Sequence, residues 1–246
     1  MTLLRPVLIA AAAGALLAAL VLTMVQSLWI TPLILRAETY EDSAATHGDA
    51  VAHSHDAADA AAADGHSHQH VDGHHHDHSE WKPENGWQRT LFTLAANIAL
   101  GFGYALILAG LCWLWRAPDG VWQGLLVGAC GFLVFFVAPG LGLPPELPGT
   151  AAAELGARQH WWLATVGASA VGGALLVLQR RWWARALGLA LLLAPHLVGA
   201  PQPDVEASLA PATLQTQFRI ATTVANALFW LLLGATFATA LRRSAR

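Results

Sequence analysis

Six apolar runs constrain the fold of this chain more than any other feature of its sequence. Each run holds roughly 16–25 residues, and about 20 residues of helix cross the hydrocarbon core of a bilayer. Backbone groups in hydrocarbon must satisfy one another, so apolar runs of this length predict helices. The runs cover residues 7–30, 91–115, 121–138, 161–178, 183–198 and 220–241. The chain is therefore predicted to be an all-α integral membrane protein with about six (five to six) transmembrane helices.

The overall composition agrees with this class and excludes others. Apolar residues make up 55% of the 246-residue chain and charged residues only 12%, unlike a typical soluble domain. Lys82 is the only lysine and no basic patch occurs, so no nucleic acid is expected as a partner. The two cysteines, Cys112 and Cys130, lie within apolar runs and form no Cys-x-x-Cys motif. We expect them to pack in the core rather than to ligate a metal.

The runs divide the chain into three parts. Residues 1–30 form a first transmembrane helix, which Thr31-Pro32 is expected to end. A cleavable signal peptide is the alternative, but the run is too long for one and no small-residue cleavage site follows it. Residues 31–90 form an extracytoplasmic loop, and residues 91–246 form a transmembrane helical bundle. The run 183–198 is the shortest, so it decides between five and six spans.

The distribution of arginine and lysine predicts the orientation, because cytoplasmic loops carry an excess of these residues. With six spans and a cytoplasmic N-terminus, the inner segments are richer in basic residues than the outer ones. The inner residues are Arg5, Arg116, Arg180, Arg181, Arg185, Arg242, Arg243 and Arg246, and the outer ones are Arg36, Lys82, Arg89, Arg158 and Arg219. We expect a multi-pass protein of the cell inner membrane, with both termini cytoplasmic and the long loop periplasmic.

Residues 47–78 of that loop contain ten of the twelve histidines, interleaved with six aspartates. Imidazole is the commonest protein ligand for divalent transition metals, and carboxylate often accompanies it. The segment has no apolar period, so it is expected to be disordered without metal and to bind several ions. The predicted ligands are His47, His53, His55, His66, His68, His70, His74, His75, His76 and His78. A solvated polar loop is the alternative, whereas an expression tag is disfavoured because the run is internal and irregular.

A second group of candidate ligands lies at the outer ends of the spans. Glu154 and His160 precede the fourth apolar run, and His196 follows Pro195 late in the fifth. A helix broken at a proline can present backbone oxygens beside an imidazole. We therefore expect Glu154, His160 and His196 to form an outer metal-binding vestibule. The alternative for His196 is a hydrogen bond within the bundle or a position among the lipid headgroups.

Polar residues inside the spans have two interpretations. Gln26, Asn97, Thr222 and Asn226 lie in apolar runs, where polar groups usually face the interior of the bundle. They fit an ion path and interhelical hydrogen bonds equally well.

The sequence contains no motif for catalysis or for energy coupling. A Walker A loop requires Gly-Lys followed by Ser or Thr, whereas Lys82 is followed by Pro83. No Gly-x-Ser-x-Gly or His-Glu-x-x-His motif occurs either. We do not expect an enzyme, and any transport is gradient-driven, channel-like or powered by a partner.

Five blocks of sequence resemble a known family. They are PLILRAETYE at 32–41, WQRTLFT at 87–93, GLGLPPELPG at 140–149, RQHWW at 158–162 and PHLVGAP at 195–201. Together with the histidine-rich insert they resemble the large membrane subunit of the proposed Cbt-type cobalt transporters, the CbtA family. The resemblance covers nearly the whole chain. It implies cobalt uptake for cobalamin synthesis, about five spans, and a small single-span partner with a histidine-rich tail.

The residues and the resemblance lead to one main hypothesis and two rivals. The chain is expected to be a subunit of a divalent metal uptake system, with the histidine-rich loop capturing the ion. Co²⁺ is the expected substrate, with Ni²⁺ or Zn²⁺ as alternatives, because nitrogen and oxygen ligands do not by themselves select cobalt. One rival is a membrane haem protein with His160 and His196 as axial ligands. The other is a metal-sensing or storage protein that carries no flux.

Overall fold

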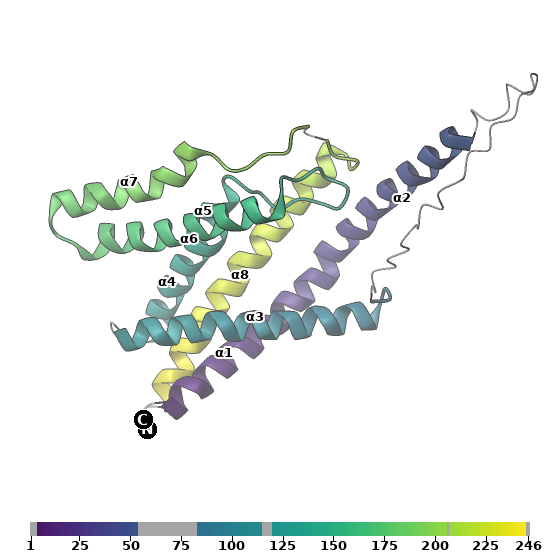
Figure 1. The fold of residues 1–246 in the computed structure, drawn as a ribbon. Coiled ribbons are helices and arrows are strands. Elements are labelled where there is room, and N and C mark those ends of the chain that lie inside the picture. Colours follow the sequence, from purple (N-terminus) through teal and green to yellow (C-terminus); the bar gives the residue numbers. More distant parts are fainter. Residues whose placement is uncertain (1–3, 54–82, 115–119, 206, 245–246) are drawn as a thin grey trace, which may run out of the picture.

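The fold is an all-helical bundle in a computed structural model that describes residues 4–53, 83–114, 120–205 and 207–244. The elements, shown in Figure 1, are α1 (Leu4–Val25), η1 (Gln26–Ile30), α2 (Thr31–His53), α3 (Trp87–Leu114), α4 (Val121–Phe132), η2 (Leu133–Val137), α5 (Ala138–Gly140), α6 (Leu155–Leu178), α7 (Trp182–Val198) and α8 (Ala212–Ser244). An isolated bridge between Thr150 and Ser208 is the only β pairing within these residues. The predicted all-α membrane class is confirmed.

Five helices in the described part of the chain are long and apolar enough to cross a membrane. They are Val7–Ala44, Trp87–Leu111, Val121–Gly140, Leu155–Leu178 and Ala212–Arg243. The sixth apolar helix, α7, has 17 residues and is about 25 Å long at 1.5 Å per residue. It is therefore a little shorter than the hydrocarbon core, which is about 30 Å thick. The residue that ends it, Gly199, has a φ of 86°, a conformation that favours glycine.

The first helix does not end at Thr31-Pro32, so the sequence-based boundary is wrong. Helix α1 passes through the π-helical turn η1 directly into α2, which continues to His53. In η1 the Thr31 N–H donates to the carbonyl oxygen of Gln26, five residues earlier. Proline normally breaks a helix because it lacks an N–H and its ring clashes with the carbonyl four residues before it. The wider π turn just before Pro32 shifts the hydrogen-bond register and lets the helix continue.

The same arrangement occurs a second time, at the end of α4. The π-helical turn η2 is followed by Ala138-Pro139, and the Ala138 N–H donates to the carbonyl oxygen of Leu133. Pro139 is buried at the start of the short helix α5. In both places one residue separates the end of the π turn from the proline, so the two helices accommodate their prolines in the same way.

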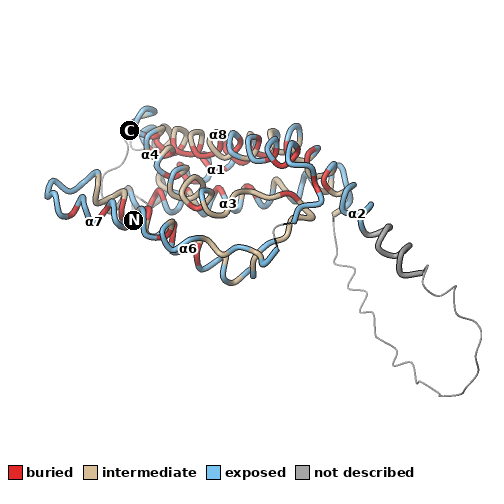
Figure 2. The backbone as a smooth tube through the Cα atoms, turned by 90° about the horizontal axis from the view of Figure 1, so that it is seen from above, coloured by how far each residue is buried: buried red, intermediate tan, exposed pale blue. Residues whose placement is uncertain are grey.

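Helices α1 and α8 are antiparallel neighbours, and this pairing places both termini at one end of the bundle (Figures 1 and 2). Midway along α1, Gly14 lies against Thr236 and Phe237 near the end of α8. At the opposite end, Arg36 of α2 and Leu214 of α8 line one small cavity. We call the first end the terminus end. We call the second the loop end, because it holds residues 141–154 and 199–211.

The remaining helices alternate in direction between these two ends. In α3, Arg89 lies beside Glu38 at the loop end, and the helix then runs back along α1. Helix α4 starts at the terminus end, where Gly120 lies beside Arg242. Helices α6 and α7 form a hairpin. At the loop end of the bundle, Trp161 Nε1 of α6 donates to the carbonyl oxygen of Pro195 in α7. The described helices therefore make six alternating passes of the bundle, counting α7 as one.

Helix α8 is the centre of the bundle, and its neighbours approach it through small residues. It packs against α1 on one side and α4 on the other, and buried residues concentrate along it (Figure 2). Gly124 and Gly128 of α4 are in backbone contact with Gly234 of α8. Gly131 leaves space for the ring of Trp230, which is 2% exposed. Lipid provides no hydrophobic driving force between helices, so close contact of this kind is the main source of packing energy.

The outside of the bundle is apolar and carries tryptophan at both ends. Trp87 is exposed at the loop end, and Trp122 and Trp182 are exposed at the terminus end. Tryptophan is enriched at both membrane–water interfaces, so these positions agree with a bilayer around the bundle. Cys130 also faces outward, so the expectation that it packs in the core is wrong. The side chain of Cys112 lies outside the described residues.

Alanine at position 234 should destabilise the protein, while alanine at position 103 should not. A Cβ at Gly234 would overlap the carbonyl oxygen of Gly124, whereas a Cβ at Gly103 of α3 meets nothing within 4 Å. Overpacking costs about 1–3 kcal/mol, and Gly→Ala at an open helix position gains about 1 kcal/mol. Thermal unfolding midpoints of the detergent-solubilised variants should fall for Gly234→Ala and stay or rise for Gly103→Ala. Equal midpoints would contradict the central α4–α8 contact.

Candidate metal site

The histidine-rich stretch begins on helix α2, which extends beyond the ends of α3 and α8 (Figures 1 and 2). Helix α2 is continued by backbone positions 47–53, the first part of this stretch. Alanine is frequent in this segment and favours helix, and the preceding turns supply the nucleus that a new helix lacks. The side chains of His47 and His53 are not described. The other eight predicted ligands lie outside the described residues: His55, His66, His68, His70, His74, His75, His76 and His78.

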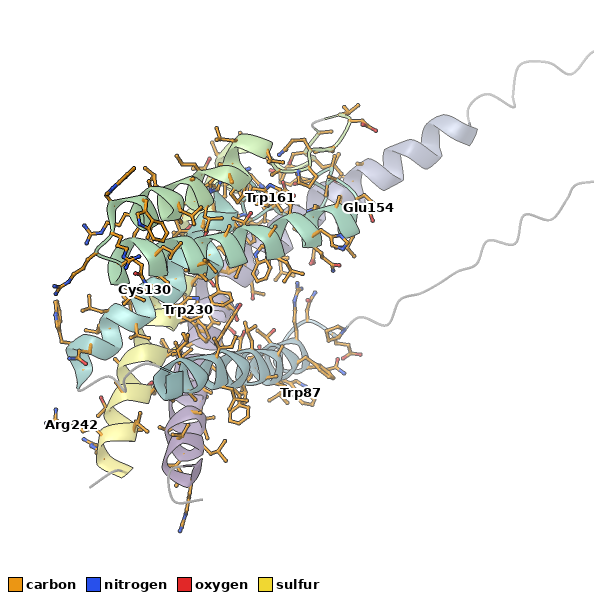
Figure 3. All side chains as sticks on the ribbon, turned by 60° about the vertical axis from the view of Figure 1, so that its left-hand side comes forward. Trp87, Cys130, Glu154, Trp161, Trp230 and Arg242 are labelled. Carbon is orange, nitrogen blue, oxygen red and sulfur yellow. The ribbon has the colours of Figure 1, made fainter. Side chains whose placement is uncertain are left out.

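Glu154 caps the N-terminus of α6, at the loop end of the bundle (Figure 3). Its carboxylate accepts hydrogen bonds from the N–H of Gly156 at 2.9 Å and of Ala157 at 2.8 Å. These two backbone donors, with a smaller contribution from the nearby His160, lower the pKa of Glu154 below its ordinary value. Glu154 is fully exposed, so it can also contact an ion from solvent.

His160 lies six residues after Glu154, on α6, and is exposed. Its Nδ1 is 2.7 Å from the carbonyl oxygen of Gly156. A carbonyl oxygen can only accept, so the ring hydrogen belongs on Nδ1 and the lone pair on Nε2 faces away from this bond. Metal-ligating histidines commonly bind through one ring nitrogen while the other donates to a carbonyl. His160 therefore has the local geometry of an available ligand.

His196 lies in the last turn of α7, on the other helix of the hairpin. Its ring meets the ring of Trp161 edge to face, with centroids 6.0 Å apart. The carbonyl oxygen of the preceding Pro195 accepts from Gly199 N–H at 3.0 Å and from Trp161 Nε1 at 3.3 Å. The end of α7 is thus tied to α6, and His196 is held against an aromatic ring.

The α6–α7 hairpin therefore brings Glu154, His160 and His196 to the same end of the bundle. Glu154 and His160 are close enough to interact electrostatically. In the described part of the chain, however, no three His, Cys, Asp or Glu side chains form a group that could hold a metal ion. Their assignment as ligands stays a prediction, and an ion bound by any of them would keep water in part of its coordination shell.

Next to the hairpin lies an open cavity of about 960 Å³, lined by residues of α2, η2, α5, α6 and α8 and by the loop 143–152. Its walls are largely apolar, and Glu146 and Arg158 are the charged residues among those that line it. Their side chains form an ion pair with an oxygen–nitrogen distance of 3.8 Å. The Gly/Pro-rich block at 140–149 could be recognised from the sequence. The pairing of Glu146 with Arg158 could not be predicted from it, because the two residues lie on different elements.

Gln215 is a second residue that sequence analysis did not single out. It is buried in α8, and its Oε1 accepts from the N–H of Leu147 at 3.1 Å. Its Nε2 donates to the carbonyl oxygen of Pro145 at 3.5 Å. The side chain of Leu147 is also buried. These contacts fix the Gly/Pro-rich loop to the central helix.

Polar residues inside the spans are partly explained by hydrogen bonds between helices. Asn97 of α3 donates to Thr23 Oγ1 at 2.9 Å and to Gln26 Oε1 at 2.6 Å. For this trio the interhelical interpretation is confirmed. On α8, Asn226 donates to the carbonyl oxygen of Thr222, while the Thr222 hydroxyl is buried without a partner in the described structure.

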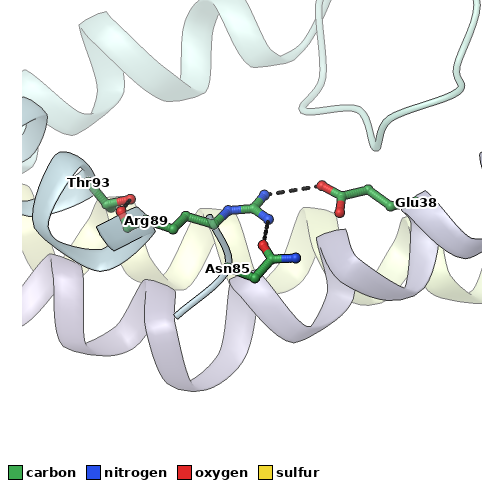
Figure 4. Close-up of polar contacts among 4 residues, drawn as sticks. All are labelled: Glu38, Asn85, Arg89 and Thr93. Carbon is green, nitrogen blue, oxygen red and sulfur yellow. Dashed lines mark hydrogen bonds and ion pairs between the residues drawn. The ribbon is translucent and has the colours of Figure 1, made fainter. Parts of the chain in front are cut away.

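An ion pair also links α2 to the start of α3 at the loop end (Figure 4). Arg89 donates through Nη2 to Glu38 Oε1 at 3.2 Å and through Nη1 to Asn85 Oδ1 at 2.8 Å. Both charged side chains are partly exposed, and pairs of this kind contribute little to stability. This pair lies outside the lining of the large cavity, which makes it a matched reference for Glu146 and Arg158.

The length and apolar surface of the helices define a multi-pass integral membrane protein. The family model "Probable cobalt transporter subunit (CbtA)" matches residues 4–242. The chain therefore belongs to this family of cobalt transporter subunits, and the predicted resemblance is confirmed. No curated protein and no solved structure matches the chain.

Replacing Glu154 with alanine should destabilise the first turn of α6, and this effect should occur in the absence of metal. The cap needs an ionised carboxylate, so it is present above the ordinary glutamate pKa and lost as the pH falls through the lowered pKa of the folded state. At neutral pH, hydrogen–deuterium exchange should be faster at Gly156 and Ala157 in Glu154→Ala than in the wild type. Asp204→Ala, an exposed change at the same end, should leave these amides unaffected. Unchanged exchange in Glu154→Ala would show that Glu154 is no cap.

Proposed function

We propose that this subunit belongs to a cobalt uptake system of the inner membrane and receives the ion at the loop end. One observation carries the proposal: the elements that bear the candidate ligands all reach the loop end. Helix α2 leads into the histidine-rich stretch there, and the candidate ligands Glu154, His160 and His196 lie on the same side. The cavity with its Glu146 carboxylate opens there as well. Family membership supports cobalt as the substrate.

The charges at the two ends support an orientation with the loop end in the periplasm. At the terminus end the described arginines are Arg5, Arg180, Arg181, Arg185, Arg242 and Arg243, and at the loop end they are Arg36, Arg89, Arg158 and Arg219. Two of the four at the loop end are in ion pairs with glutamate. By the positive-inside rule, the end with more arginines faces the cytoplasm. Both termini are then cytoplasmic, which requires α7 to count as a sixth pass.

In this proposal the histidine-rich loop captures Co²⁺ and raises its concentration beside the bundle. Neutral imidazoles on a tethered segment exchange ions quickly among themselves and hold them near the loop end. Glu154, His160 and His196 are proposed as the next ligands, with His160 binding through Nε2. Similar ligands also accept Ni²⁺ and Zn²⁺, so these ions act as competitors.

A partner subunit completes the proposed system. The family name describes a transporter subunit, and the chain shows no nucleotide-binding motif in its sequence. We propose a small single-span membrane protein with a histidine-rich tail as the partner. Cobalt delivered in this way would supply cobalamin synthesis.

Deleting residues 47–78 should impair uptake at low metal and spare it at high metal. A segment that only concentrates ions becomes dispensable once external metal saturates the bundle. Uptake of radiolabelled cobalt by cells should show a half-saturating concentration raised on the order of tenfold, with maximal uptake nearly unchanged. A control chain with the ten histidines replaced by serine should behave like the deletion. Loss of maximal uptake with normal protein abundance would contradict capture as the role of the loop.

The C-terminus should lie on the cytoplasmic side. A fluorescent protein that is inactive in the periplasm, fused after Arg246, should fluoresce because six passes return the chain to its starting side. The complementary fusion, a phosphatase that is active only in the periplasm, should show no activity at the same position. If the fluorescent fusion were dark and the phosphatase fusion active, the protein would have five spans and α7 would not cross the membrane.

A further inference from the structure

The large cavity at the loop end contains a single carboxylate in apolar surroundings. Phe135, Phe136, Leu143, Trp162 and Phe218 are among the apolar residues that line it. The Glu146 side chain is 28% exposed and the Arg158 side chain 33% exposed. Arg158 supplies the positive charge that faces this partly exposed carboxylate.

The ion pair between these residues is long and therefore easily exchanged. Its shortest oxygen–nitrogen distance is 3.8 Å, compared with 3.2 Å between Glu38 and Arg89. Charge-assisted hydrogen bonds between nitrogen and carboxylate oxygen are about 2.7–2.9 Å long, so the Glu146–Arg158 pair has no direct hydrogen bond. Partly exposed pairs of this kind contribute roughly 0–1 kcal/mol. A divalent cation attracts the carboxylate more strongly than the monovalent guanidinium does.

The position of Glu146 is fixed by its neighbours in the loop. Pro145 precedes it and Pro148 follows shortly after, and proline restricts the backbone to a narrow range of φ. The adjacent Leu147 is buried and hydrogen-bonded to Gln215 of α8. The Glu146 carboxylate is therefore held at the cavity wall by a rigid support, as a preorganised ligand requires.

We propose that Glu146 is a binding site for the divalent cation inside this cavity, and that Arg158 occupies the carboxylate when no ion is bound. This inference rests on the proposed function, because cobalt is taken as the cation. Gln159 is also among the residues that line the cavity, and an amide oxygen belongs to the same hard class of ligand as a carboxylate. Water completes the coordination shell, as is usual for carboxylate-bound divalent ions.

Exchange of Arg158 for an ion would also alter how the α6–α7 hairpin is held. Arg158 belongs to α6, which packs chiefly against α7. Glu146 belongs to the loop that Gln215 fixes to α8. The ion pair therefore joins the hairpin to the central helices. A second connection, the contact of the Trp161 ring with Gly142, remains when the pair opens.

Equilibrium dialysis of the purified full-length protein with radiolabelled Co²⁺ tests the site. The background is a full-length chain with the ten histidines of residues 47–78 replaced by serine, which removes binding by the loop. This protein should bind about one ion per chain at the cavity. Glu146→Gln should raise the dissociation constant at least about tenfold, the equivalent of about 1.4 kcal/mol. Arg158→Gln should lower the same constant, because the competing guanidinium is gone.

The opposite signs of these two effects separate a binding site from a structural ion pair. A purely structural pair would give the same loss in both variants, and so would misfolding. The matched controls Glu38→Gln and Arg89→Gln alter an ion pair outside the cavity and should leave the dissociation constant unchanged. Equal effects of Glu146→Gln and Arg158→Gln, or no effect of either, would overturn the proposal. Normal dialysis results with no cobalt uptake in cells would instead reject the proposed transport function and leave the binding site in place.

Discussion

The close approach of α8 to its two neighbours is the contact on which the rest of the structure depends. Helices in lipid gain little from burying apolar surface, so they associate where small residues allow dense backbone contact. Gly124, Gly128 and Gly234 provide that contact between α4 and α8. Helix α1 packs on the other side of α8, where Gly14 lies against Thr236. With α8 fixed in this way, Gln215 in its first turn anchors the Gly/Pro-rich loop at the loop end.

Rigid local geometry at the loop end follows from proline and from two π turns. Pro32 and Pro139 would break ordinary helices, but η1 and η2 let the chain continue through them. The helix that carries the histidine-rich stretch therefore projects from the bundle as a direct continuation of the first span. After α5 the chain turns into the Gly/Pro-rich loop, which Gln215 fixes to α8.

The proposed function and the proposed cavity site place two kinds of metal chemistry at this end of the molecule. Imidazoles on a tethered segment favour rapid capture of borderline ions from dilute solution. In the proposed cavity site a single carboxylate acts differently, because it exchanges a guanidinium partner for a divalent cation. Capture followed by exchange is a sequence of steps that needs no covalent chemistry and no nucleotide in this chain. It fits a transporter subunit that works with a partner.

The sequence by itself determined the membrane class, because apolar length is a local property and about 20 apolar residues are enough to cross the bilayer. Its motifs identified the family, but the number of spans was left at five or six. The sequence also identified the Gly/Pro-rich block and located the histidines. The sequence-based prediction of a helix end at Pro32 was wrong, because the π turn just before this proline lets the helix continue. Only the tertiary structure showed that Glu154 caps α6 and that Glu146 faces Arg158. These are contacts between residues on different elements or around a helix end, and their geometry depends on how the helices pack. Periodicity and composition carry no information about such packing.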